Sequence, residues 1–178
     1  PPPAEIAELA HKKGLVIFED AGSGALNSLA EYGLADEPVI GDSIADGADI
    51  VSFSGDKLLG GSQAGLIVGK RELIERVRKH PLYRALRVDK LSYAVIESTL
   101  DSYARGKASD EIPVIRMITM SAENLASRAG EFLGKLNDRT IGNLNAELVQ
   151  GSSVIGGGAA PSVKLRTTLI ALTHKNES

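Results

Sequence analysis

The chain has 178 residues, of which 43% are hydrophobic, and it carries a formal net charge of −3 and no cysteine. This length and composition suffice to bury the core of one large or two small domains, and the lack of cysteine excludes disulfides and thiolate catalysis. The net negative charge argues against broad, non-specific binding to nucleic acid.

We expect neither a membrane span nor an export signal in this sequence. No window approaches the roughly 18 consecutive apolar residues of a membrane-spanning helix, and no charged segment precedes an apolar one at the start. The cytoplasm is therefore the expected location. The three histidines, His11, His80 and His174, lie far apart, and we expect no metal site.

The first part of the sequence alternates predicted helices with short apolar strands. Helices are predicted at residues 4–13, 43–46 and 71–79, and strands at residues 15–18, 49–54 and 64–68. This alternation predicts an α/β fold with a mainly parallel sheet.

The rest of the sequence predicts a second, smaller domain. Asp89 is a suitable N-cap for a long helix that ends at Arg105-Gly106, and a polar segment and Pro113 follow. We therefore predict one domain at 1–106 and a small, incomplete α+β domain at 107–178. Its expected elements are a helix at 121–136 capped by Ser121, strands at 146–149, 153–155 and 167–172, and a glycine-rich loop from 156 to 161.

Lys57 is the strongest candidate for a reactive residue. It follows the apolar run Ile-Val-Ser-Phe-Ser at 50–54 and precedes Leu-Leu-Gly-Gly at 58–61, so its amine stands at a strand end among small residues. A lysine that attacks a carbonyl group needs such a rigid and uncrowded position. The ordinary alternative is a solvated lysine in a turn.

Asp20 is the expected partner of Lys57, because ligands of open α/β sheets bind outside the carboxyl ends of the strands. A lysine and an aspartate are the two groups that pyridoxal phosphate chemistry most needs: the lysine holds the cofactor, and the aspartate keeps its ring an electron sink. Ser54, and less directly Ser52, offer hydroxyl groups for the cofactor phosphate, although serines at strand ends are also common without such a role.

Two nucleotide-binding interpretations of the glycines fail on spacing. Arg71, not Ser or Thr, follows Gly69-Lys70, and Ala64 stands where a P-loop has its first glycine. The segment Gly22-Ser-Gly24 begins like a dinucleotide fingerprint, but Asn27 occupies the third glycine position.

Several segments together resemble bacterial selenocysteine synthase, the L-seryl-tRNA(Sec) selenium transferase. The densest is Ser-Phe-Ser-Gly-Asp-Lys-Leu-Leu-Gly-Gly at 52–61, and the others are 20–24, 63–65, 83–90 and 112–119. Ala21 and Ser62 depart from the family's usual apolar residue and proline, but neither is a reacting group. Family members have well over twice as many residues, so we expect a fragment or truncated relative that lacks the upstream half of the active site.

The resemblance implies the large domain of a fold type I pyridoxal phosphate-dependent transferase, followed by the small domain. It implies that Lys57 holds the cofactor and removes the Cα proton, and that Asp56 assists loss of the seryl hydroxyl as a general acid. It also implies that Gln63, Arg84 and Arg87 bind substrate, the two arginines holding the anionic selenophosphate. The basic residues at 70–79 are more typical of a solvated helix face, since Glu72 and Glu75 interleave with them.

The implied reaction converts seryl-tRNA(Sec) to selenocysteinyl-tRNA(Sec) by loss of water and addition of selenium from selenophosphate. The implied assembly is a homo-oligomer built from dimers, with the tRNA contacts mainly in the absent N-terminal part. Two alternatives stay open: a related pyridoxal phosphate-dependent ammonia-lyase acting on a small amino acid or amino sugar acid, and a non-catalytic oligomerisation fragment.

Overall fold

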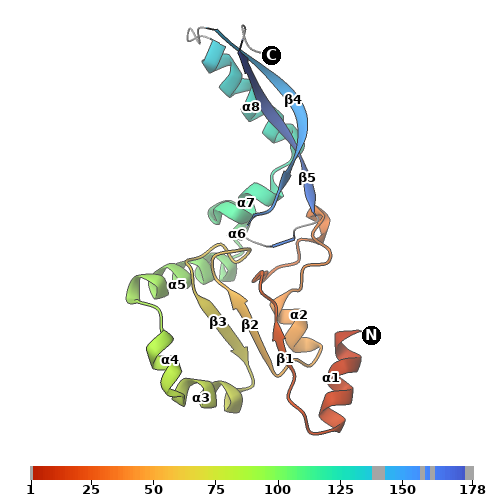
Figure 1. Cartoon of the computed structure of the whole chain (residues 1–178), viewed down its shortest axis with the longest axis vertical. Helices are drawn as coiled ribbons and strands as arrows, with labels where there is room; N and C mark the ends of the chain where they lie inside the picture. The colour runs from red at the N-terminus through yellow and green to blue at the C-terminus, as the bar shows by residue number, and fades with distance from the viewer. Residues whose placement is uncertain (1, 138–142, 157–158, 161–162, 175–178) are drawn as a thin grey trace.

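A computed structural model of the chain describes residues 2–137, 143–156, 159–160 and 163–174. It shows a mixed α/β fold with two separate sheets at opposite ends of an elongated molecule (Figure 1). Strands β1 (Phe18–Asp20), β2 (Ile50–Ser54) and β3 (Gly65–Gly69) form one sheet, and β4 (Leu144–Val154) and β5 (Lys164–His174) form the other. Two short helices, α6 (Ala108–Glu111) and α7 (Pro113–Thr119), lie between them. The predicted boundary after residue 106 falls just before these helices and stays a prediction.

The three-stranded sheet is mixed. β1 and β2 pair in parallel, from Phe18 opposite Ile50 to Asp20 opposite Ser52, whereas β2 and β3 pair antiparallel. The prediction of a mainly parallel sheet is therefore confirmed for the first pair and wrong for the second. The loop at 55–64 contains no helix, and a parallel return requires a crossover of about a dozen residues or more.

Helices flank this sheet, and local sequence explains their ends. They are α1 (Pro3–Lys12), α2 (Ile40–Ala45), α3 (Arg71–Lys79), α4 (Pro81–Leu86) and α5 (Lys90–Ala104), with a short 3-10 turn at Ala30–Tyr32. Pro81 follows the end of α3 and is the first residue of α4. The His80 ring caps α4, because it accepts a hydrogen bond from the N–H of Leu82 at 3.2 Å. Asp89 accepts from the N–H of Ser92 at 2.9 Å, which confirms its predicted role as the N-cap of α5.

The strand predicted at 15–18 is displaced, because β1 begins at Phe18 and Leu15 and Val16 are exposed. The backbone before β1 is engaged elsewhere: the N–H of Leu15 donates to the carbonyl of Ala10, and the N–H of Ile17 donates to the Asp49 carboxylate. As a consequence, Asp20 is the last residue of the strand itself.

The second sheet is a long hairpin covered by α8 (Ala122–Asn137). Ser121 accepts a hydrogen bond from the N–H of Asn124 at 3.2 Å, as expected of a cap. The strands predicted at 146–149 and 153–155 are one continuous strand, because all 11 residues of β4 pair with β5. The predicted loop at 156–161 lies partly outside the described residues.

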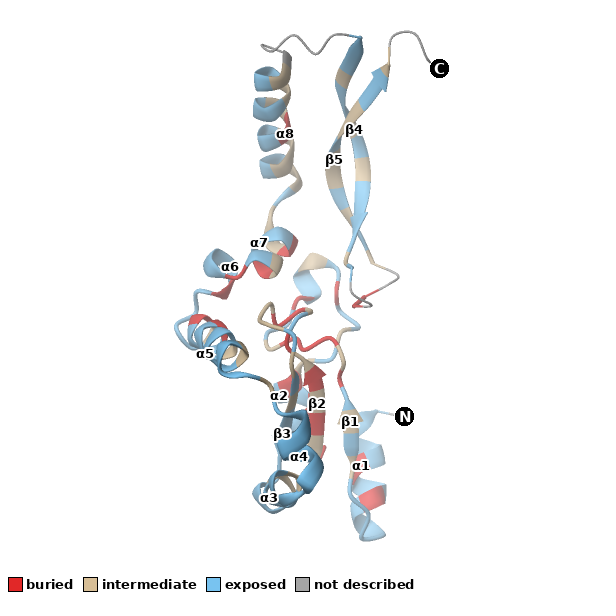
Figure 2. Cartoon of the chain, turned by 60° about the vertical axis from the view of Figure 1, so that its left-hand side comes forward, coloured by how far each residue is buried: buried red, intermediate tan, exposed pale blue. Residues whose placement is uncertain are grey.

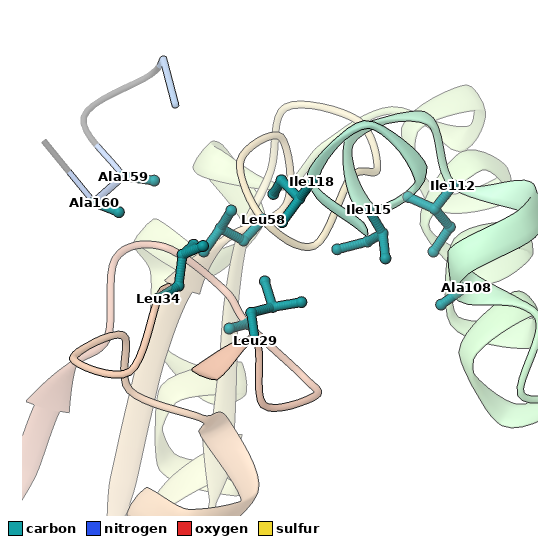
Figure 3. Close-up of a cluster of buried hydrophobic side chains, with 10 residues drawn as sticks. Leu29, Leu34, Leu58, Ala108, Ile112, Ile115, Ile118, Ala159 and Ala160 are labelled. Carbon is teal, nitrogen blue, oxygen red and sulfur yellow. The ribbon is translucent and has the colours of Figure 1, made fainter. Parts of the chain in front are cut away.

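Two clusters of buried hydrophobic residues hold the chain together. One lies against the three-stranded sheet and comprises Ala21, Ile40, Ala48, Val51, Phe53 and Leu59. The other joins the loop after β2 to α6 and α7 and comprises Ala25, Leu29, Leu34, Leu58, Ala108, Ile112, Ile115, Ile118, Ala159 and Ala160 (Figure 3). Burial is dense on β2 and sparse on the hairpin (Figure 2). Among the described residues, no helix is both long enough and apolar enough to cross a membrane.

Asp49 stabilises one end of the three-stranded sheet, the end that lies away from Lys57. Its carboxylate is 3% exposed, accepts from Lys70 Nζ at 2.5 Å and from the N–H of Ile17 at 2.7 Å, and lies 3.0 Å from His11 Nε2. The hydrogen bond from Lys70, followed by that from Ile17, holds the pKa of Asp49 well below its ordinary value. One carboxylate thus joins the ends of α1 and β3 to the starts of β1 and β2.

We expect Asp49→Ala to lower the free energy of unfolding by about 2 kcal/mol, because a buried acceptor of several hydrogen bonds is lost. Because the pKa of Asp49 is depressed in the folded state, its carboxylate stabilises the fold at pH values above its unfolded-state pKa of about 4. This contribution is lost as the pH falls toward the folded-state pKa. Urea unfolding between neutral and acid pH measures both effects. The exposed Asp36→Ala variant is the control, and an equal loss in both variants would contradict the role given to Asp49.

Candidate active site

Lys57 lies in the loop that follows β2, and its amine stands over the turn that follows β1. A Cβ atom added at Gly22 would lie 3.9 Å from Lys57 Nζ. Gly22 comes two residues after Asp20, which ends β1. The structure therefore brings the amine to the turn that directly follows Asp20, at the carboxyl ends of two parallel strands.

Hydrogen bonds fix the backbone on both sides of the lysine. The N–H of Leu58 donates to the carbonyl of Ser23 at 2.9 Å, which ties the lysine loop directly to the β1 turn. Within the loop, the N–H of Gly60 donates to the carbonyl of Lys57 at 3.1 Å and the N–H of Gly61 donates to that of Gly55 at 2.7 Å. The loop is glycine-rich, yet its peptide groups are largely engaged.

Two glycines permit this close approach. Gly24 has φ of 76°, and a Cβ atom there would overlap the carbonyl oxygen of Ser54. Gly60 has φ of 78°, and a Cβ atom there would overlap the side chain of Ile112. Any other residue would be strained at both positions.

The Asp20 carboxylate has a partner within the sheet. Ser52, its neighbour across the β1–β2 pair, donates a hydrogen bond from Oγ to Asp20 Oδ1 at 3.1 Å. Ser52 thus orients the carboxylate, and its predicted contact with a cofactor phosphate stays a prediction. Ser54, half-buried at the end of β2, lies opposite Gly65.

Asp56 and Lys57 line a pocket of about 370 Å³. Its other walls are Leu58, Gly60 and Gly61 of the same loop, Pro113 and Val114 of α7, and Ile155, Gly156 and Ala159 after β4. Asp56 is exposed there, and Gln63 is exposed further along the loop. The pocket therefore lies between the lysine loop and the second part of the chain.

Arg84 and Arg87 lie elsewhere in the chain. Both are exposed at the end of α4. Arg87 lines a different, mainly apolar groove of about 1150 Å³ between β3 and α3 to α5, together with Arg76 and Arg78. Within the described residues of one chain, the two predicted arginines are thus not brought into the Lys57 pocket.

Tyr103 lies next to the lysine loop, and the sequence did not predict this contact. Its hydroxyl lies 3.2 Å from the carbonyl oxygens of both Leu58 and Leu59, and burial raises the pKa of Tyr103 to about 12. The sequence placed Tyr103 only within the long helix predicted after Asp89, and a contact across 45 positions leaves no local signal.

A solved structure of D-glucosaminate-6-phosphate ammonia-lyase has a similar fold. The similarity covers 97% of this chain and 37% of that chain, with a TM-score of 0.55 and 18% sequence identity. At this identity the likeness shows the shared α/β fold alone.

The chain belongs to the L-seryl-tRNA selenium transferase family, whose model matches residues 1–178. It is 47% identical over 170 residues to the L-seryl-tRNA(Sec) selenium transferase of Solidesulfovibrio magneticus, 43% over 169 residues to that of Geobacter sulfurreducens, and 45% over 171 residues to that of Alkaliphilus metalliredigens. These matches cover 95%, 94% and 96% of this chain but 36%, 37% and 36% of the relatives. The resemblance inferred from the sequence is confirmed, and the chain spans about a third of these relatives' length.

The two glycines of the β1 turn offer a matched test of this geometry. We expect Gly24→Ala to destabilise the chain by roughly 2 kcal/mol or more. The substitution places a Cβ atom on a residue with positive φ, where it overlaps the backbone of Ser54. Gly22→Ala adds only an ordinary contact with the Lys57 amine and should leave the free energy of unfolding within about 1 kcal/mol of the original. Urea unfolding compares the two, and similar losses would contradict the close approach of turn and loop.

Proposed function

We propose that this chain carries the cofactor lysine of a selenium transferase, and that the protein containing it converts seryl-tRNA(Sec) to selenocysteinyl-tRNA(Sec). Pyridoxal phosphate is the proposed cofactor and selenophosphate the proposed selenium donor. The observation that carries the proposal is the position of the Lys57 amine above the glycine turn that directly follows Asp20, in a chain of the L-seryl-tRNA selenium transferase family. The cytoplasm is the proposed location of this reaction on tRNA.

The residues present fit the proposed cofactor. Pyridoxal phosphate needs an amine for its aldehyde carbon and a carboxylate that accepts a hydrogen bond from its protonated ring nitrogen. Lys57 supplies the amine, and Asp20, which accepts a hydrogen bond from Ser52 at 3.1 Å, supplies the carboxylate. Gly22 leaves space beside the amine, and Ser54 is the proposed phosphate ligand. When bound, the cofactor supplies an electron sink for charge that develops at the substrate Cα.

The side chains of the pocket then have separate roles in proton transfer. The Lys57 amine, when free, takes the proton from the seryl Cα. Asp56 is exposed on the same pocket and donates a proton to the departing hydroxyl group as a general acid. Gln63, in the same loop, contacts the substrate. Ser52 acts indirectly, by orienting Asp20.

Arg84 and Arg87 are the proposed ligands of the selenophosphate anion. Two guanidinium groups three positions apart can hold one oxyanion by charge-assisted hydrogen bonds. Because Arg87 lines a groove separate from the Lys57 pocket of its own chain, we propose that they serve a neighbouring subunit of a homo-oligomer built from dimers.

Similarity of fold does not separate this function from an ammonia-lyase, whereas the sequence matches favour the transferase. Turnover of seryl-tRNA(Sec) against release of ammonia from free serine or an amino sugar acid distinguishes the two. A third outcome, no cofactor binding by the full-length protein, would leave only the non-catalytic alternative.

Lys57→Ala tests the central role. In the full-length protein that contains this chain, we expect the variant to lose the visible absorbance band of lysine-bound pyridoxal phosphate and to form selenocysteinyl-tRNA at least about a thousandfold more slowly. Lys79→Ala, an exposed lysine of α3, is the control and should keep both properties. Retention of the band and the activity by Lys57→Ala would refute the proposal.

The arginines call for a different readout. We expect Arg84→Ala and Arg87→Ala each to raise the KM for selenophosphate about tenfold or more, since each removes a charge-assisted hydrogen bond to the anion. The cofactor absorbance should not change. Arg71→Ala, exposed at the start of α3, is the matched control. An unchanged KM for selenophosphate in both variants would show that Arg84 and Arg87 do not bind the selenium donor.

A further inference from the structure

Tyr103 reaches the lysine loop from the last turn of α5. Its hydroxyl is 3.2 Å from the carbonyl oxygen of Leu58 and 3.2 Å from that of Leu59, the two residues that directly follow Lys57. Both distances are slightly longer than the roughly 2.5–3.0 Å that is usual for an O–H···O hydrogen bond. The phenol has one proton, so it is shared between the two carbonyl groups or alternates between them.

The Tyr103 ring is itself firmly placed. It is half-buried and packs against both hydrophobic clusters, and it is the one side chain of the described residues that the two clusters share. Leu58 and Leu59 are both 0% exposed and belong to different clusters. The hydroxyl is therefore presented to the lysine loop from a fixed ring and not from a mobile side chain.

The three peptide groups after Lys57 are bonded in succession. The carbonyl of Lys57 accepts from Gly60, the N–H of Leu58 donates to Ser23, and the carbonyls of Leu58 and Leu59 face the Tyr103 hydroxyl. Ser23 belongs to the turn after β1, whereas Tyr103 belongs to α5. The direction in which the Lys57 side chain leaves the backbone is thus fixed from two elements that are distant in sequence.

We propose that Tyr103 is a positioning residue for the Lys57 amine, acting through the hydrogen bonds that it donates to the backbone immediately after the lysine. The proposal rests on the proposed function of Lys57. It deepens that function by assigning the orientation of the amine to a residue outside the lysine loop and the β1 turn.

The chemistry of the phenol agrees with this role. A carbonyl oxygen only accepts hydrogen bonds, so the contact requires the protonated phenol. Burial raises the pKa of Tyr103 to about 12, and the hydroxyl therefore stays a donor throughout the neutral range. Phenylalanine would fill the same space, so packing alone does not require the hydroxyl.

Tyr103→Phe isolates the hydrogen bond, because it keeps the ring and removes the donor. In the full-length protein loaded with pyridoxal phosphate, we expect kcat to fall roughly 10- to 100-fold while the KM for seryl-tRNA changes less than about twofold, since a misplaced reacting group costs rate rather than binding. In the chain without cofactor, we expect amide hydrogen exchange at residues 58–61 to quicken about tenfold. Tyr32→Phe is the control, because Tyr32 packs half-buried against the same cluster.

The outcomes separate this inference from the function on which it rests. If Lys57→Ala is inactive and Tyr103→Phe keeps the original kcat and exchange at 58–61, Tyr103 only packs and the inference is overturned. If Lys57→Ala is active, the proposed function fails, and the inference fails with it. The unsubstituted chain gives a test that does not depend on folding of a variant. Amides at 58–61 should exchange as slowly as those of β2. Exchange as fast as that of the exposed residues Ala35 and Asp36 would also overturn the inference.

Discussion

The site depends on one constraint: the two residues after Lys57 are buried in different cores. Leu58 packs with Leu34, Ile115 and Ile118 in the cluster that joins the loop to α7, and Leu59 packs in the cluster against the sheet. When two consecutive side chains pack into separate cores, a shift of the backbone between them would disturb the packing of both. Close-packed interiors tolerate little displacement, so the backbone conformation at these two residues is fixed. The backbone after the lysine is therefore held by the two clusters that contain most of the buried hydrophobic residues of the described chain, although Lys57 itself lines a pocket.

Glycine has the opposite of its usual effect in this loop. A run such as Gly60-Gly61 suggests flexibility, yet Gly60 is engaged with Lys57 and packs against Ile112, and Gly61 donates to Gly55. The absent side chains let backbone approach backbone, and the close approach is what permits these hydrogen bonds. The glycines of this loop therefore fix its backbone instead of loosening it.

Sequence predicted those features whose cause is local. The caps at Asp89 and Ser121 depend on a side chain and an N–H three residues away, and both were found where expected. The Lys57 and Asp20 positions followed from the general rule for strand ends. The strand predicted at 15–18 was wrong because its backbone is drawn to Asp49, more than thirty positions on, and the Tyr103 contact was missed for the same reason. Which distant group takes a backbone hydrogen bond is decided by tertiary structure, and no periodicity records it.

The distribution of rigidity over the chain bears on how a donor anion would be held. The lysine loop is buried at its base, whereas α4, which carries Arg84, has no buried residue, and Arg87 directly follows it. Exposed arginines on such a helix offer attraction that salt screens, at a site that is not preorganised. An anion held firmly enough to react needs those guanidinium groups enclosed by a second surface, where the local dielectric constant is lower. The groove beside Arg87 is large and mainly apolar, so a protein surface that covers it would supply that enclosure. The covalent and the electrostatic parts of the proposed reaction thus make different demands on the fold: the proposed lysine needs a fixed backbone, whereas the proposed arginines need a second surface that encloses them.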